Sequence, residues 1–190
     1  MKGSYPKGVA KREEILRVTL EIFGREGERN TTLRAIAEES NISLTGLMHY
    51  FASKDHLLTE VLRANDNAAE QRYNAPGAVR DPGEFLALAM AANTADAARV
   101  RLYVTLAAAS TDPGHPAHAY FKTRFAWIRR VIVDYVEAEQ RAGRVDRGRD
   151  PALLATALLA AADGVQLQWL SDPRIDMAAS VRGVWRALLG

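Results

Sequence analysis

The stretch from Thr31 to Lys54 reads TTLRAIAEESNISLTGLMHYFASK, and it decides the fold class. Thr31 or Thr32 can cap a short helix that ends near Ser40, and Ser43 can cap a second one that ends near Tyr50. Between them, Asn41 belongs to the few residue types other than glycine that tolerate a left-handed backbone. Two short helices joined by so tight a turn predict a helix-turn-helix.

An amphipathic helix precedes this motif. From about Gly8 to Arg25, the residues of one face recur at helical spacing: Ile15, Val18, Thr19, Ile22 and Phe23. Gly27 predicts the end of this helix. We therefore expect three helices around one small core, with the first bracing the two short ones.

The rest of the chain also predicts helices. It contains no sustained alternation of apolar and polar residues between hairpin turns. Asp81-Pro82 and Asp150-Pro151 each combine a capping carboxylate with a proline suited to the first helical turn. The sequence predicts an all-α fold of about nine helices, the later ones near residues 53–73, 82–95, 97–110, 116–141, 151–170 and 175–189.

Composition excludes several classes of protein. The 190 residues include no cysteine, which excludes disulfides, thiolate zinc sites and a cysteine nucleophile. The longest apolar run, Pro151 to Ala162, has 12 residues, fewer than the ~20 of a membrane span. The first residues lack the apolar core of a signal peptide. We expect a cytoplasmic protein with no membrane partner. Because 25 basic and 23 acidic residues leave a net charge of +2, any binding of nucleic acid must depend on local arrangement.

Motifs of catalysis and metal binding are missing from the sequence. It contains no phosphate-binding glycine loop, no nucleophile elbow and no H-E-x-x-H helix. His115 and His118 lie one helical turn apart, but Pro116 between them and the lack of a third ligand favour a loop and a helix start over a metal site. We expect no catalytic residue, no cofactor and no bound metal.

The second short helix of the motif offers a slim outer face. Its spacing turns Leu47, Tyr50 and Phe51 toward the core and leaves other side chains outward for base edges in a major groove. Flanking groups suit phosphates. The predicted DNA-binding residues are Thr32, Ser43, Leu44, Thr45, Gly46, Met48, His49, Tyr50 and Lys54.

This stretch resembles the DNA-binding domain of the tetracycline-repressor (TetR) family of bacterial transcription regulators. Asn41 stands in place of the family's usual turn glycine, Met48 in place of a tyrosine, and Leu44 where a basic residue is frequent. The resemblance implies a DNA-binding domain at residues 8–68 and an effector-binding and dimerisation domain at residues 69–190. The matching residues are Thr32, Ile36, Ala37, Ile42, Ser43, Leu47, Tyr50, Phe51, Lys54 and Leu57.

The last two predicted helices leave apolar faces to pair. Residues 161–173 are similar to the penultimate-helix signature of a TetR subgroup, and a four-helix interface between two chains would bury both faces. Packing within one chain is the alternative. The predicted interface residues are Leu154, Ala157, Leu158, Ala161, Val165, Gln168, Val181, Val184, Trp185 and Leu188.

The middle helices carry candidates for an effector pocket. They combine apolar bulk with a few polar groups, which suits a lipophilic or aromatic small molecule; ordinary core packing is the alternative. These residues are Met90, Asn93, Tyr103, Tyr120, Phe121, Trp127 and Trp169.

Together these features predict a homodimeric repressor that binds a near-palindromic operator and is released by a small-molecule effector. Two alternatives stay open at this point. One is a helical small-molecule-binding protein or enzyme whose N-terminal helices only pack, and the other is a transcriptional activator on the same fold.

Overall fold

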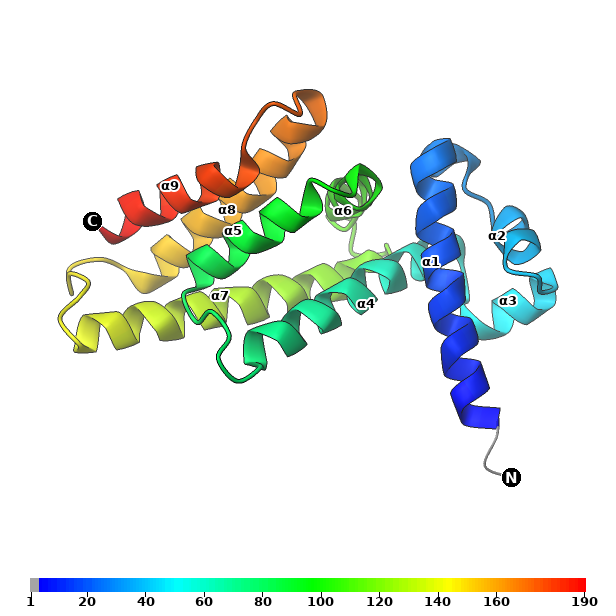
Figure 1. Ribbon diagram of the computed structural model, residues 1–190, viewed down its shortest axis with the longest axis horizontal. Helices are drawn as coiled ribbons and strands as arrows, with labels where there is room; N and C mark the ends of the chain where they lie inside the picture. Colours follow the sequence, from blue (N-terminus) through cyan, green and yellow to red (C-terminus); the bar gives the residue numbers. More distant parts are fainter. Residues whose placement is uncertain (1–3) are drawn as a thin grey trace. The chain divides into compact units, whose positions relative to one another are not determined.

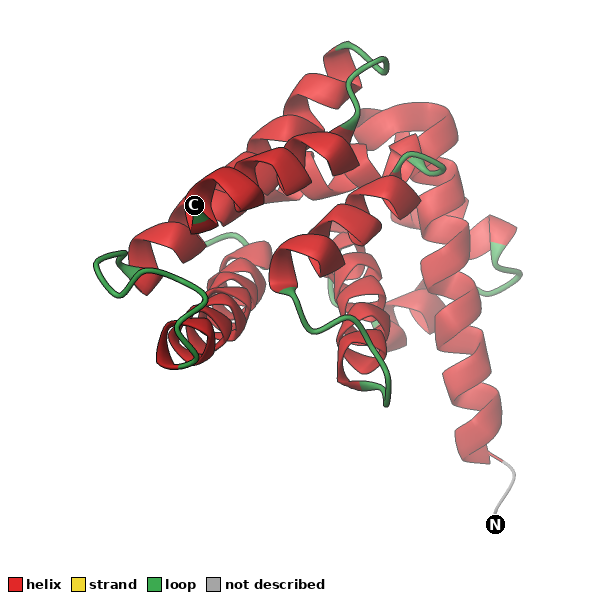
Figure 2. Cartoon of the chain, turned by 60° about the vertical axis from the view of Figure 1, so that its left-hand side comes forward, coloured by secondary structure: helices red, strands yellow, loops and turns green. Residues whose placement is uncertain are grey.

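The computed structural model describes residues 4–190, with side chains from Lys7 onward. Over this range it contains helices and no strand, which confirms the all-α prediction (Figure 2). Figure 1 labels the helices in chain order: α1 (Ser4–Asn30), α2 (Leu33–Glu39), α3 (Leu44–Tyr50), α4 (Lys54–Asn74), α5 (Pro82–Asn93), α6 (Ala97–Ala109), α7 (Ala117–Arg141), α8 (Pro151–Ser171) and α9 (Met177–Leu189).

The helices form two compact units. The first contains the described residues up to Ala68 together with Arg101–Tyr120, and the second contains Ala69–Val100 and Phe121–Gly190. The unit limits fall inside α4, α6 and α7, so each of these three helices contributes residues to both units.

The core of the first unit is built on α1. All five residues of its predicted apolar face are buried, and the Thr19 hydroxyl is satisfied because it donates to the Ile15 carbonyl (2.7 Å). Ile36 of α2, Leu47 of α3 and Leu57 of α4 complete this core. The helix begins earlier than predicted, at Ser4; the backbone leaves the helical conformation at Gly27 (φ 76°, ψ 175°), as the sequence predicted, and a short further turn beyond this kink reaches Asn30.

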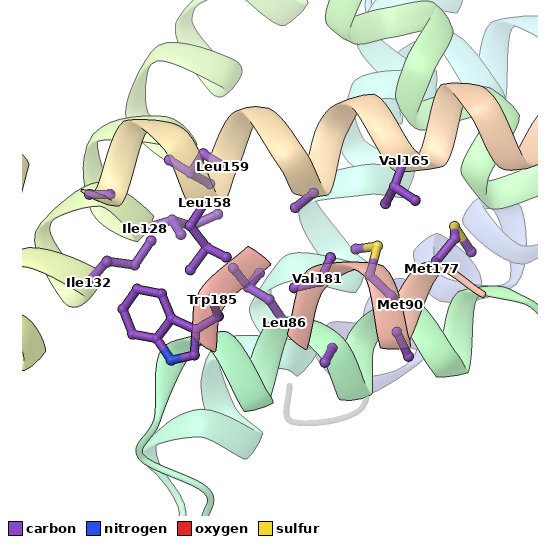
Figure 3. Close-up of a cluster of buried hydrophobic side chains, with 14 of the residues drawn as sticks. Leu86, Met90, Ile128, Ile132, Leu158, Leu159, Val165, Met177, Val181 and Trp185 are labelled. Carbon is purple, nitrogen blue, oxygen red and sulfur yellow. The ribbon is translucent and has the colours of Figure 1, made fainter. Parts of the chain in front are cut away.

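The second unit has its core between α5, α7, α8 and α9. Figure 3 shows Leu86 and Met90 of α5 facing Val181 of α9, with Leu158 of α8 beside them. Among the described residues, α8 is the one helix long and apolar enough to cross a membrane by length and composition alone. Buried residues along its length pack into this core, as expected for the central helix of a helical domain.

The start of α5 is tied to α7 and α9. Asp81 caps α5 by accepting from the Glu84 amide (2.9 Å), as its sequence predicted, and it also accepts from the Tyr135 hydroxyl (3.2 Å). Burial, followed by the Asp81 carboxylate, raises the pKa of Tyr135 to about 12. Arg182 of α9 donates two hydrogen bonds to Glu84, both 2.7 Å, which joins α9 to the same helix end.

Trp185 lies directly on this helix end. A Cβ added at Gly83 would lie 2.1 Å from Cδ1 of the indole ring, far inside van der Waals contact. The buried Trp185 Nε1–H has no hydrogen-bond partner in the described part of the chain. Only glycine at position 83 therefore lets α5 approach α9 this closely.

Candidate nucleic-acid interface

The cap of α2 settles which threonine begins the motif. The Ala35 amide donates to Thr32 Oγ1 (3.1 Å), so Thr32 is the N-cap. Thr31 is buried instead, and its hydroxyl donates to the Gly27 carbonyl (2.7 Å). Thr31 thereby ties the kinked end of α1 to the start of the motif.

The turn between α2 and α3 is a Schellman motif. The Asn41 amide donates to the Glu38 carbonyl and the Ile42 amide to the Ala37 carbonyl, both at 3.0 Å. Asn41 has φ of 51°, the left-handed conformation that the sequence predicted for it. Lys11 of α1 also donates to the Ser40 carbonyl (3.0 Å), which fixes the turn against the first helix.

Ser43 begins α3 and orients it. Its side chain accepts from the Gly46 amide (3.0 Å), so the predicted cap is confirmed. Leu47 is fully buried and turns one side of the helix into the core. Leu44, which is 39% exposed, and Met48, which is 52% exposed, lie on one flank of the helix. Thr45 and His49 are exposed beside them.

Tyr50 corrects one prediction. It was expected to point toward the core but is 38% exposed. It is the last residue of α3, and the chain then becomes extended at Phe51 (φ −141°, ψ 122°). Phe51 therefore fills the core position, and the Tyr50 ring lies at the surface, 6.3 Å from the Phe51 ring between centroids.

Lys54 stands at the first position of α4. Its ammonium group donates to the Glu28 carbonyl of α1 (2.9 Å), which holds the start of α4 next to the end of α1. Ser53 caps the same helix by accepting from the His56 amide (3.1 Å). The Lys54 ammonium group is thus held in position by α1, four residues after the end of α3.

A charged pair neutralises the last acidic residue of α2. Arg25 donates to both carboxylate oxygens of Glu39, at 3.3 and 2.9 Å. These hydrogen bonds from Arg25 hold the pKa of Glu39 below its ordinary value. The carboxylate at the end of α2 is therefore balanced by a cation of α1.

The two histidines considered for a metal site have structural roles. His115 Nδ1 accepts from the Ala117 amide (3.1 Å) at the start of α7, and His118 Nδ1 lies 2.9 Å from the Ser110 carbonyl. Among the described residues, no group of three or more His, Asp or Glu side chains could hold a metal ion.

The predicted pocket residues fall into both compact units. Tyr103 and Tyr120 belong to the first, and the remaining five belong to the second. In the second unit, Asn93 Nδ2 lies 3.5 Å from Gln166 Oε1, and Gln166 is buried on α8. Gln166 was not among the residues predicted for a pocket, although an amide within an apolar helical run was a usable signal.

An aromatic cluster in the second unit was also missed in part. Tyr73 packs edge-on against Phe85 (4.9 Å between centroids) and against the predicted Trp127 (6.5 Å). Tyr73 and Phe85 lie on α4 and α5, on either side of a loop, so no sequence spacing links them.

The predicted interface residues divide by burial. Ala157, Ala161, Val184 and Leu188 are half-buried and Gln168 is exposed. The most exposed leucines of the last two helices are different residues, Leu153 at 64% and Leu167 at 57%. The other predicted residues are already covered by the core of their own chain: Leu154, Leu158, Val165, Val181 and Trp185.

Fold and site together define a protein of the helix-turn-helix class. A family model described as "Bacterial regulatory proteins, tetR family" matches residues 15–61, the segment that holds this motif. Over these residues the chain resembles the TetR family.

Curated relatives match over the same part of the chain. An uncharacterised HTH-type transcriptional regulator from Xanthobacter autotrophicus is 45% identical over 49 residues, which is 26% of this chain and 24% of the relative. The transcriptional regulator RutR of Escherichia coli is 43% identical over 54 residues, 28% of this chain and 26% of the relative. The match thus spans about a quarter of each relative's length.

Solved structures show the same fold over nearly the whole chain. Salmonella enterica GusR superposes with a TM-score of 0.74 at 22% identity, covering 100% of this chain and 98% of GusR. Bacillus subtilis FadR, solved in complex with stearoyl-CoA, gives a TM-score of 0.72 at 14% identity, covering 94% of this chain and 97% of FadR. A putative transcriptional regulator from Saccharomonospora viridis, solved in complex with choline, gives a TM-score of 0.72 at 23% identity, covering 93% of each chain.

Proposed function

We propose that the protein is a homodimeric, cytoplasmic transcription repressor that places α3 of each subunit in a major groove of a near-palindromic operator. One observation carries this proposal: α3 is held by a cap, a Schellman turn and a buried Leu47, yet its other side is open to solvent. A rigid helix with one uncovered face is the element that helix-turn-helix proteins insert into DNA.

The exposed residues suit two kinds of contact. Leu44, Thr45, Met48 and His49 face the base edges, and Gly46 lets the backbone come close to the groove. Phosphates are bound by flanking groups with hydroxyl or ammonium donors, which fix the position of the protein on the duplex. These are Thr32, Ser43, Tyr50 and Lys54.

The proposed dimer pairs the outer faces of α8 and α9. Gly164 and Gly183 lie on these helices, and among the described residues nothing beyond the helix's own backbone and the two chain neighbours comes within 4 Å of where a Cβ would stand at either. Glycine inside a helix costs about 1 kcal/mol relative to alanine. Close approach of a backbone from a second subunit would explain why glycine stands at both positions. The half-buried interface residues and Leu153 and Leu167 would then be covered.

The proposed organisation assigns residues 8–68 to DNA binding and residues 69–190 to effector binding and dimerisation. The half-buried amide of Asn93 and the buried amide of Gln166, in the second unit, support a lipophilic or aromatic effector with one polar group. Effector binding would release the operator by favouring a state that cannot bind DNA. That solved proteins of this fold hold stearoyl-CoA or choline supports such a role, and no catalytic step is proposed.

Selection of bound sequences from random duplex DNA tests the proposal. We expect an enriched palindrome with half-sites about one helical turn apart. Fluorescence anisotropy on that duplex should show affinity falling with salt, with a log–log slope of about −0.9 per phosphate contact. Lys54→Ala should make this slope shallower. The absence of any enriched duplex at low salt would contradict the proposal and favour a small-molecule binder whose N-terminal helices only pack.

A further inference from the structure

The side chains of α3 lack the groups that usually read bases. Its sequence is LTGLMHY, with no Arg, Lys, Asn, Gln, Asp or Glu. Those residue types make the common hydrogen-bonded contacts to guanine, adenine and cytosine in the major groove. Bidentate recognition of a base is therefore excluded for this helix.

Two large apolar side chains are exposed on one side of α3 instead. Leu44 and Met48 are four residues apart, so they lie on the same side of the helix one turn from each other. Both are among the large apolar residues that the fold leaves exposed. Contacts within the fold thus give no reason for their apolar character.

The surroundings of this apolar pair indicate what covers it. Ser43 and Tyr50, at the two ends of α3, carry hydroxyl groups, and Lys54 follows with a fixed ammonium group. Such groups suit phosphates on both sides of a groove, and an apolar strip between them then faces its floor. The apolar group on the floor of a major groove is the C5-methyl of thymine.

We propose that Leu44 and Met48 select the operator by packing against thymine methyl groups, so that affinity depends on those methyls more than on hydrogen bonds to the bases. This inference rests on the proposed function and specifies its sequence preference. Each half-site has thymine where these two side chains reach, and Thr45 and His49 supply the remaining polar contacts.

Replacement of thymine by deoxyuridine tests the inference, because it removes the methyl and leaves base pairing unchanged. The probe is the tightest duplex recovered from random DNA, with each thymine replaced in turn at both symmetry-related positions. Burial of one methyl corresponds to about fourfold in affinity, so a symmetric replacement should weaken binding by about 15-fold at the contacted positions. Thymines elsewhere should show no change.

Variants of α3 connect the effect to its residues. In Leu44→Ala and Met48→Ala, the loss of affinity caused by deoxyuridine should disappear at the position that each side chain contacts, so that both duplexes bind equally well. Both residues are exposed, so melting temperatures should remain unchanged. Leu88→Ala is the matched control, since Leu88 is a 45% exposed leucine on α5 and should keep the full penalty.

The outcomes distinguish the two proposals. A duplex that binds tightly but is insensitive to every thymine replacement, or that has no thymine in its half-sites, overturns the inference and leaves the proposed function standing. A deoxyuridine penalty that persists in both α3 variants overturns it as well. If no duplex is bound, the proposed function fails and the inference fails with it.

Discussion

Gly83 and Trp185 show how one side-chain position controls the contact between two helices. Because the Trp185 ring is rigid and buried, Gly83→Ala should force the methyl and the ring apart. Overpacking of this kind lowers the free energy of unfolding by about 1–3 kcal/mol. Denaturant unfolding of the two proteins measures the difference.

Two further variants show whether steric overlap is the cause. Gly8 is a helical glycine with open space around its Cβ position. The variant Gly8→Ala should therefore leave stability unchanged or raise it slightly. Adding Trp185→Leu to Gly83→Ala should cost less than the sum of the two single changes, since the smaller side chain makes room. Strict additivity would argue against the overlap.

Single residues also show where prediction from sequence ends. Asn41 and Ser43 were predictable because a left-handed turn and a helix cap each accept few residue types. Thr31 and Thr32 were not distinguishable, since both can cap and only the path of the chain buries one of them. Tyr50 was misplaced because helical spacing was continued across a position where the helix ends.

Among the elements, the α2–α3 turn provides a clear test of backbone conformation. Asn41→Gly should keep or slightly raise the stability of the protein, because glycine adopts positive φ without strain. Asn41→Ala should lower it by about 1 kcal/mol, because a Cβ disfavours this conformation. Thermal unfolding of the two variants compares them directly. Equal stability of the glycine and alanine variants would contradict the expectation.

The ion pair between α5 and α9 predicts a dependence of stability on acid. Hydrogen bonds from Arg182 hold the pKa of Glu84 below its ordinary value of 4.5. The folded state therefore binds the proton less readily than the unfolded state, so the pair's full contribution is present above about pH 4.5 and is lost as the pH falls through the lowered pKa. Glu84→Gln should be less stable than the parent near neutral pH and should lose this deficit in acid.

Urea unfolding from pH 7 to pH 3 measures this difference. Glu13→Gln is a suitable control, since Glu13 forms no ion pair with any residue whose side chain the structure describes. A deficit of Glu84→Gln that stays constant down to pH 3 would show that the ion pair is not its source.

Elements differed in how far the sequence determined them. The starts of α5 and α8 followed from Asp81-Pro82 and Asp150-Pro151, because these pairs act locally. The orientation of α8 did not follow, because this helix is apolar nearly all round and its spacing does not reveal which side faces its own core. Of the residues predicted for an interface, three on α8 and two on α9 are buried within the chain's own core: Leu154, Leu158, Val165, Val181 and Trp185.

At the scale of the whole molecule, the proposed dimer can be tested through its exposed leucines. Leu153 and Leu167 lie on one side of α8, and an acidic residue at either place would be desolvated in an interface. The double variant Leu153→Glu/Leu167→Glu should be monomeric by analytical ultracentrifugation and should bind operator DNA more weakly. Its melting temperature will fall only if dimerisation stabilises the fold.

Leu88→Glu is the control for this change, because it places the same charge at an exposed leucine of α5. It should leave the oligomeric state as in the parent. A parent protein that is itself monomeric at micromolar concentration would contradict the proposed dimer.

Three helices are divided between the compact units, and this division matters for anyone who wishes to exchange the proposed DNA-binding domain, residues 8–68, for another. A hybrid gene joined at residue 68 would transfer Asp55, Arg63 and Asp66 without the partners they have in the intact unit. Those partners arrive much later in the chain: His115 lies 3.8 Å from Asp55, and the Tyr120 ring lies beneath the Arg63 guanidinium while its hydroxyl donates to Asp66. A graft that also carries Arg101–Tyr120 keeps these contacts, so a working hybrid requires two transplanted segments where the order of residues alone suggests one.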